Sequence, residues 1–174
     1  RHRFRSDISA HRGRNLSRVT LAPPWLEFDL GQEMTVLSWS VNRPGFVQAR
    51  QILWREVRNA DLPPDINIQS WVRKTLSERE ANSAVLLLTS RAISTFKTRT
   101  SQVEGVEAQC VATVGLSNAE RVGTRVDYAQ RDWGTINIAV RISAGLSQVG
   151  LLEALSVAVQ ARTTAIMDAE FALP

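Results

Sequence analysis

Gly134-Thr-Ile-Asn-Ile-Ala-Val-Arg-Ile142, together with the segment from Ser147 to Asp168, indicates the fold class of this chain. In the first stretch the residues alternate with the period of a β-strand, which places Ile136, Ile138 and Val140 on one face and Thr135, Asn137 and Ala139 on the other. In the second stretch a serine suited to cap a helix precedes apolar residues at helical spacing, among them Leu151, Leu155 and Ile166. The chain therefore combines strands with at least one long helix.

Further strands and helices are predicted upstream of this stretch. Five segments have strand character: 16–30 with a break at Pro23-Pro24, 34–41, 84–88, 93–99 as an edge strand, and 106–114. Residues 46–57 and 66–76 carry apolar side chains at helical spacing and are predicted to form helices. This order indicates an α/β fold. We expect a single domain in which one mixed β-sheet, holding the strands near 35–41, 84–89, 106–114 and 135–142, packs against helices.

The composition indicates one folded domain preceded by a basic leader. The chain has 174 residues, of which 44% are apolar, enough for one sizeable core. Residues 1–18 hold six arginines and one aspartate, so their formal charge is +5, whereas the whole chain carries +4 and the residues after the leader −1. A nucleic-acid binder needs a basic stripe on its folded surface. We therefore expect a flexible leader over 1–18, a domain over 19–174 and no nucleic-acid partner.

The residue types also argue against several kinds of site. A single cysteine, Cys110, cannot form an internal disulfide, and two histidines, His2 and His11, do not suffice for a zinc cluster. The longest aliphatic run, residues 84–88, is far shorter than the roughly 20 residues that cross a bilayer. We expect no metal, no cofactor, no membrane association and a cytoplasmic location. Cys110 is expected to be a core residue, because no histidine within the folded body would activate its thiol.

Small polar residues gather beside glycines where strands are predicted to end. The three segments are Leu88-Thr89-Ser90, Ala112-Thr-Val-Gly-Leu-Ser-Asn-Ala119 and Asp132-Trp-Gly-Thr-Ile-Asn137. Ligands bind at the strand ends of α/β sheets, but the same residue types also form turns, so the spacing alone leaves a structural role open. Asn137 is the strongest candidate, because a buried asparagine without partners would cost about 1–3 kcal/mol. Nucleophile elbows, phosphate loops and dinucleotide fingerprints are absent from the sequence.

These same segments resemble the adenosylcobinamide amidohydrolases of the CbiZ type. The resemblance extends from about Thr35 to the end of the chain and rests on Val85-Leu-Leu-Leu-Thr-Ser90, on the Thr-Val-Gly segment within 112–119, on Gly134-Thr-Ile-Asn-Ile138 and on the helix over 151–168. Two departures stand out. Ala161-Arg162 replaces the Ala-Lys usual in the family, and the family's Gly-Thr-rich tail with an aspartate is not among the 174 residues.

The resemblance implies hydrolysis of the amide that joins the aminopropanol arm to the corrin ring of adenosylcobinamide, in cobalamin biosynthesis by cobinamide salvage. The substrate would be a small-molecule corrinoid, and a homo-oligomer would be compatible with this function. Amide hydrolysis needs a positioned nucleophile, donors for the developing oxyanion and an acid for the leaving amine. The expected catalytic residues are Asp132 as the base, Asn137 and Thr135, with Glu33 as a second choice of base. The expected substrate-binding residues are Thr89, Ser90, Thr113, Gly115, Asn118 and Gly134.

Two other classes of function compete with this one. A non-catalytic corrinoid-binding or regulatory module would keep the same pocket and lack a base, and turnover of a corrinoid amide separates it from the enzyme. A nucleic-acid binder that uses the arginine leader would show a steep salt dependence of its DNA affinity.

Overall fold

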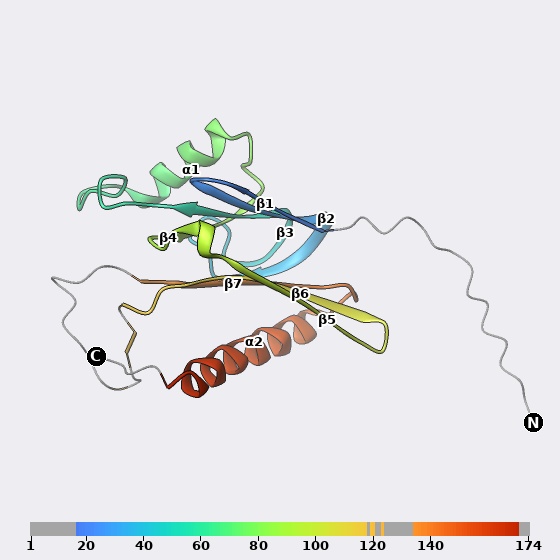
Figure 1. Cartoon of the computed structure of the whole chain (residues 1–174). Coiled ribbons are helices and arrows are strands. Elements are labelled where there is room, and N and C mark those ends of the chain that lie inside the picture. Colours follow the sequence, from blue (N-terminus) through green and yellow to red (C-terminus); the bar gives the residue numbers. More distant parts are fainter. Residues whose placement is uncertain (1–16, 118, 121–122, 124–133, 171–174) are drawn as a thin grey trace, which may run out of the picture.

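Two β-sheets lie face to face, and each carries one helix on its outer side (Figure 1). The computed structural model describes residues 17–117, 119–120, 123 and 134–170. The four-stranded sheet has the order β1 (Arg18–Ala22), β2 (Trp25–Ser38), β3 (Gly45–Glu56), β4 (Val85–Thr89), and the three-stranded sheet the order β5 (Lys97–Val103), β6 (Val106–Val114), β7 (Ile136–Ile142). Helix α1 (Ile68–Glu78) covers the first sheet and α2 (Gln148–Asp168) lies along the second, while the short 3₁₀ helix η1 (Ile93–Thr95) comes just before β5.

The α/β class and the single domain are confirmed, but the prediction of one sheet is wrong. The expected strands near 35–41 and 84–89 belong to β2 and β4, and those near 106–114 and 135–142 are β6 and β7 of the other sheet. The four-stranded sheet is mixed, because β1, β2 and β3 pair antiparallel whereas β4 runs parallel to β3. Alternation along a strand shows which residues share a face and not which strands pair. The division into two sheets is therefore a property of the packed chain.

The helix predicted over 46–57 is also wrong, since this segment is strand β3. Ile52 and Trp54 point into the layer between the sheets, whereas Leu53 packs against α1. A strand covered on both faces carries apolar residues at consecutive positions, and these matched the spacing of three and four that a helix shows. The helix prediction was therefore wrong because α1 covers one face of β3 and the three-stranded sheet covers the other.

The other predicted elements are present. Pro23-Pro24, joined by a cis peptide, separates β1 from β2, and the edge strand predicted over 93–99 is η1 followed by the exposed strand β5. Ser147 caps α2, because its side-chain oxygen accepts a hydrogen bond from the Gly150 amide. Residues 1–16 of the predicted leader lie outside the described residues. Its predicted end at residue 18 is wrong, because Arg18 is the first residue of β1 and pairs with Asp29.

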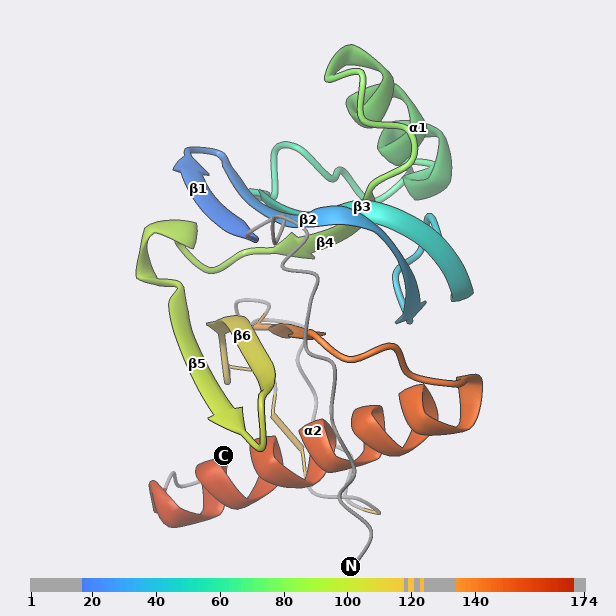
Figure 2. The ribbon, with the colours of Figure 1, turned by 90° about the vertical axis from the view of Figure 1, so that its right-hand side faces the viewer.

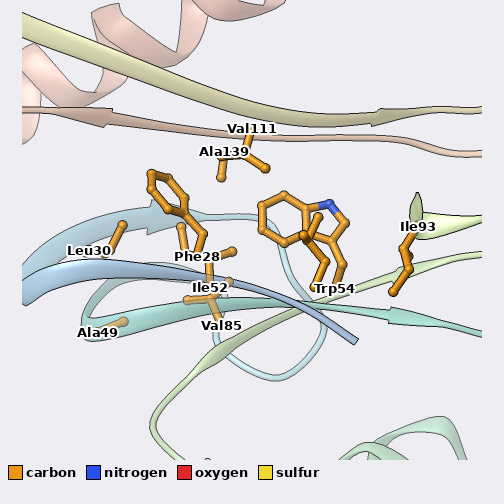
Figure 3. Packing of buried hydrophobic residues seen from close by; sticks show 10 residues of the cluster. Phe28, Leu30, Ala49, Ile52, Trp54, Val85, Ile93, Val111 and Ala139 are labelled. Carbon is orange, nitrogen blue, oxygen red and sulfur yellow. The ribbon is translucent and has the colours of Figure 1, made fainter. Parts of the chain in front are cut away.

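Two apolar layers hold these elements together. The layer between the sheets holds ten buried residues, nine of them labelled in Figure 3: Phe28, Leu30, Ala49, Ile52, Trp54, Val85, Ile93, Val111 and Ala139. The layer beneath α1 is formed by Leu53, Val72, Leu76, Ala81, Ala84 and Leu86. Trp39, in contrast, belongs to neither layer and is 74% exposed.

Helix α2 exposes apolar residues such as Val149, Val157 and Met167, and none of its residues is buried. It runs alongside the three-stranded sheet (Figure 2), and its C-terminal half faces Val114, Ile136 and Ile138 across a hollow of about 320 Å³. By length and composition alone it is also long and apolar enough to cross a membrane. Its position in the fold is that of a covering helix with room left beneath it.

Candidate functional site

Four polar residues from three separate segments meet at one end of the layer between the sheets. Thr89 ends β4, and Thr113 lies near the end of β6. Thr135 directly precedes β7, and Asn137 is the second residue of that strand. Asn137 Nδ2 donates a hydrogen bond of 2.7 Å to the Leu88 carbonyl, and Thr135 Oγ1 lies 3.5 Å from Thr89 Oγ1. Thr113 and Asn137 are direct partners in the β6-β7 ladder. We call Thr89, Thr113, Thr135 and Asn137 the polar cluster.

The polar cluster joins neighbouring strands β6 and β7 of one sheet to strand β4 of the other. Thr89 belongs to the four-stranded sheet, whereas the other three residues lie in or next to strands of the three-stranded sheet. The contact between Thr89 and Thr135 therefore crosses the layer between the two sheets. The prediction of one sheet would make all these strands members of the same sheet, which holds for β6 and β7 but not for β4. Facing sheets produce the same meeting, because inward-pointing side chains on both strands enter one layer.

Burial changes from one side of the polar cluster to the other. Thr89 and Thr113 are each 1% exposed, Asn137 is half-buried and Thr135 is exposed. Thr89 Oγ1 accepts a hydrogen bond from the Arg91 amide at 3.1 Å, whereas Thr113 Oγ1 has no hydrogen-bond partner in the part of the chain that the structure describes. An unpaired buried hydroxyl costs about 1–3 kcal/mol, so its retention calls for an explanation.

Two glycines allow the segment that follows β6 and the segment that precedes β7 to approach closely beside the polar cluster. A Cβ on Gly134 would lie 2.5 Å from Ser117 Oγ and 2.8 Å from Ser117 N, and a Cβ on Gly115 would lie 3.1 Å from Thr135 N. The Gly115 amide donates to the Thr135 carbonyl at 2.9 Å. Gly115 therefore acts here by packing, and its N–H group is already engaged within the protein.

The expected carboxylate base cannot be placed, and a different carboxylate adjoins the polar cluster. Asp132 and Asn118 lie outside the described residues, and Glu33 is exposed on β2, where it lines the groove described below. Ser90 follows Thr89 directly and is half-buried. Glu56, which no sequence pattern singled out, is the register partner of Thr89 in the parallel β3-β4 pair, and its side chain is only 14% exposed.

Glu56 is held in place by two groups. Its Oε2 accepts a hydrogen bond of 2.9 Å from the Ile93 amide, and its Oε1 pairs with the Arg58 guanidinium. Because 46–57 was predicted as a helix, no strand end was expected at Glu56. Had the segment been identified as a strand, Glu56 would have stood at a strand end beside the other polar residues.

A groove of about 520 Å³ opens beside the polar cluster between β2, β7 and α2. All seven residues of β7 line it, including both alternating faces, so the groove runs along the open edge of that strand. Ile52, Val85 and Leu87 from the inner face of the four-stranded sheet line it too, so it reaches between the sheets. Asn137 belongs both to this β7 groove and to the polar cluster.

The described residues hold no group of three or more histidine, cysteine, aspartate or glutamate side chains placed to bind a metal ion. Cys110 is half-buried, and burial raises the pKa of its thiol. A raised pKa leaves little thiolate at neutral pH, which makes Cys110 a poor nucleophile. The groups that the described residues bring to this site are hydroxyl, amide and carboxylate groups.

Comparison with known proteins adds the identity of the family. The family model described as adenosylcobinamide amidohydrolase matches residues 9–173. The chain belongs to the adenosylcobinamide amidohydrolase family. No curated protein and no solved structure is detectably similar to it. The family name denotes a hydrolase of a corrinoid amide, and the match includes every residue of the polar cluster and the β7 groove.

Proposed function

We propose that the protein hydrolyses the amide joining the aminopropanol arm to the corrin ring of adenosylcobinamide, giving adenosylcobyric acid and aminopropanol for cobamide salvage. The observation that carries the proposal is that Asn137 lies both in the polar cluster and on the wall of the β7 groove. A large ligand body in the groove would thus bring one of its side arms to the polar cluster. The family match over residues 9–173 supports the substrate class.

Asn137 is the proposed donor to the carbonyl oxygen of the scissile amide. Its Nδ2 donates one hydrogen bond to the Leu88 carbonyl. This bond orients the side-chain amide so that its nitrogen faces β4. The second N–H of the same nitrogen is then free to donate to substrate, and preorganised donors of this kind stabilise the negative charge that develops on the oxygen. The hydroxyls of Thr89 and Thr135, 3.5 Å apart, are the proposed groups that orient the attacking water.

A carboxylate would take the proton of that water and return one to the leaving nitrogen. Asp132 remains the base suggested by the sequence, and Glu56 is the carboxylate that the structure adds beside Thr89. In the hydrolysis the water oxygen bonds to the carbonyl carbon, the C–N bond breaks and the amine leaves with the added proton.

The β7 groove is the proposed site of the corrin body. Its volume of about 520 Å³ is that of a ligand pocket, and its walls are largely apolar. Thr35 and Arg162 supply polar groups along it for the peripheral amides of a corrinoid. Trp39, three-quarters exposed on the same wall, offers a flat aromatic face on which a macrocycle would stack.

The test is to incubate the purified protein with adenosylcobinamide and to measure adenosylcobyric acid by mass spectrometry. Asn137→Ala should lower kcat about 10²-fold or more, the loss typical of an oxyanion donor. Asn82→Ala, at an exposed asparagine away from the site, is the matched control and should leave kcat unchanged. Tight corrinoid binding without any turnover would instead support the non-catalytic module.

A further inference from the structure

Among the described residues, two buried polar groups in the layer between the sheets have no hydrogen-bond partner. They are Trp54 Nε1 and Thr113 Oγ1, on side chains that are 0% and 1% exposed. A third such atom, Arg43 Nε, belongs to a guanidinium that already donates to the Gln48 carbonyl. Unpaired buried groups are rare in folded proteins, and their presence next to a polar cluster indicates a place prepared for a ligand atom or a water molecule.

Trp54 and Thr113 stand on opposite walls at the same end of that layer. Trp54 is the register partner of Leu87 on β4, and the next residue, Leu88, accepts the hydrogen bond from Asn137. Asn137 in turn is the ladder partner of Thr113. Figure 3 shows the indole of Trp54 between the sheets, with its nitrogen directed toward the end where Ile93 lies.

Both groups lie behind the inner wall of the β7 groove. Ile52 precedes Trp54 on the same face of β3, and Leu87 is the partner of Trp54 across the sheet; both Ile52 and Leu87 line the groove. On the other wall Asn137 lines the groove, and Thr113 is its partner in the ladder, so these two side chains share one face of the sheet. Trp54 and Thr113 do not themselves line the groove, but their neighbours in both sheets do, so the two side chains lie directly behind its wall.

The chemistry of the two groups matches a carboxamide. The indole N–H is a donor only and suits a carbonyl oxygen, while the threonine hydroxyl accepts from an amide N–H and can also donate. We propose that Trp54 and Thr113 form, with Asn137, the subsite that holds the scissile amide, Trp54 donating to its carbonyl oxygen and Thr113 contacting its nitrogen. This inference rests on the proposed amide hydrolysis and adds Trp54 as a catalytic residue.

In this arrangement the carbonyl oxygen receives one hydrogen bond from Trp54 Nε1 and one from Asn137 Nδ2. As water adds to the carbon, both donors face the oxygen on which charge develops. When the C–N bond breaks, the nitrogen takes up a proton, and the Thr113 hydroxyl lies beside it.

The test uses Thr113→Val, which keeps the shape of the side chain and removes the hydroxyl. The expected result is a kcat at least tenfold lower together with a melting temperature equal to or above that of the unmodified protein, because an unpaired buried hydroxyl has been removed. Thr100→Val, at an exposed position on β5, is the matched control and should change neither quantity. A purely structural hydroxyl would give the higher melting temperature with full activity, and that result would overturn the proposal.

Trp54→Phe supplies the second arm of the test, since it keeps an aromatic ring and removes the N–H donor. It should lower kcat about tenfold or more at a temperature at which circular dichroism shows the variant to be folded. If both variants retain full kcat while Asn137→Ala loses activity, the subsite is wrong and the proposed function stands. If the unmodified protein does not hydrolyse adenosylcobinamide, both proposals fail.

Discussion

Replacement of Gly134 by alanine should reveal how closely the segment before β7 must approach the segment after β6 to form the polar cluster. The added Cβ would lie 2.5 Å from Ser117 Oγ and 2.8 Å from Ser117 N. The serine hydroxyl can rotate away, but the backbone nitrogen can move only if the end of β6 shifts relative to the start of β7. Such overpacking costs typically about 1–3 kcal/mol of unfolding free energy, or a drop in Tm of roughly 2–4 °C per kcal/mol for a chain of this size.

Two other glycines make this prediction quantitative. A Cβ on Gly115 meets Thr135 N at 3.1 Å, so a shift of a few tenths of an ångström suffices and the loss should be smaller. A Cβ on Gly145 meets nothing within 4 Å, so Gly145→Ala should be neutral or stabilise by up to about 1 kcal/mol. Urea unfolding followed by circular dichroism gives the three free energies, and kcat/KM for adenosylcobinamide should fall in the same order as stability.

A Gly134→Ala variant as stable and as active as the unmodified protein would show that the close approach of Gly134 to Ser117 is not required. An equal loss of stability in Gly145→Ala would also contradict the prediction, because the effect would then owe nothing to the close approach of Ser117.

Three further predictions concern single side chains. If Glu56 is the base, Glu56→Gln should lower kcat about 10²-fold. KM should change little, because the glutamine oxygen can still accept the hydrogen bond from the Ile93 amide. A variant whose kcat equals that of the unmodified protein across the pH-rate profile would exclude this role. Trp39→Ala should raise the KM for adenosylcobinamide about tenfold without changing the urea midpoint, because the side chain is 74% exposed; an unchanged KM would place the corrin body elsewhere. Burial raises the pKa of Asp29, but the Gly31 amide and Arg50 lower it more, so the net pKa is lowered. Its contribution to stability is therefore present above the unfolded pKa of about 3.9 and lost as pH falls through the folded value. The stability advantage over Asp29→Asn in urea unfolding should shrink below about pH 4, and an advantage that grows there would contradict this sign.

The periodic signals within single elements were enough to predict much of the fold. The alternation over 134–142 placed Asn137 and Ala139 on one face and the isoleucines on the other, and the structure has Asn137 and Ala139 on the face toward the four-stranded sheet. The serine cap predicted the start of α2, and the two prolines predicted the break between β1 and β2. These features depend on residues close together in the chain, where backbone geometry and capping act directly.

The sequence motifs were also sufficient to indicate the family. The segments around Thr89, Thr113 and Asn137 carried the resemblance, and the same three residues meet in the polar cluster. Their spacing in the sequence identified the residues, but it did not show what lies between them.

The strand character of β3, the separation into two sheets and the surroundings of the polar cluster depend on tertiary packing. The segment over 45–56 is a strand because α1 and the second sheet both cover it, and a pattern of apolar residues does not reveal how many faces are covered. Glu56 and Trp54 lie beside the cluster for the same reason, since both come from this strand. Whether a buried hydroxyl such as that of Thr113 finds a partner depends on atoms brought from distant segments. Contacts of that kind depend on how the sheets pack, which local sequence patterns do not encode.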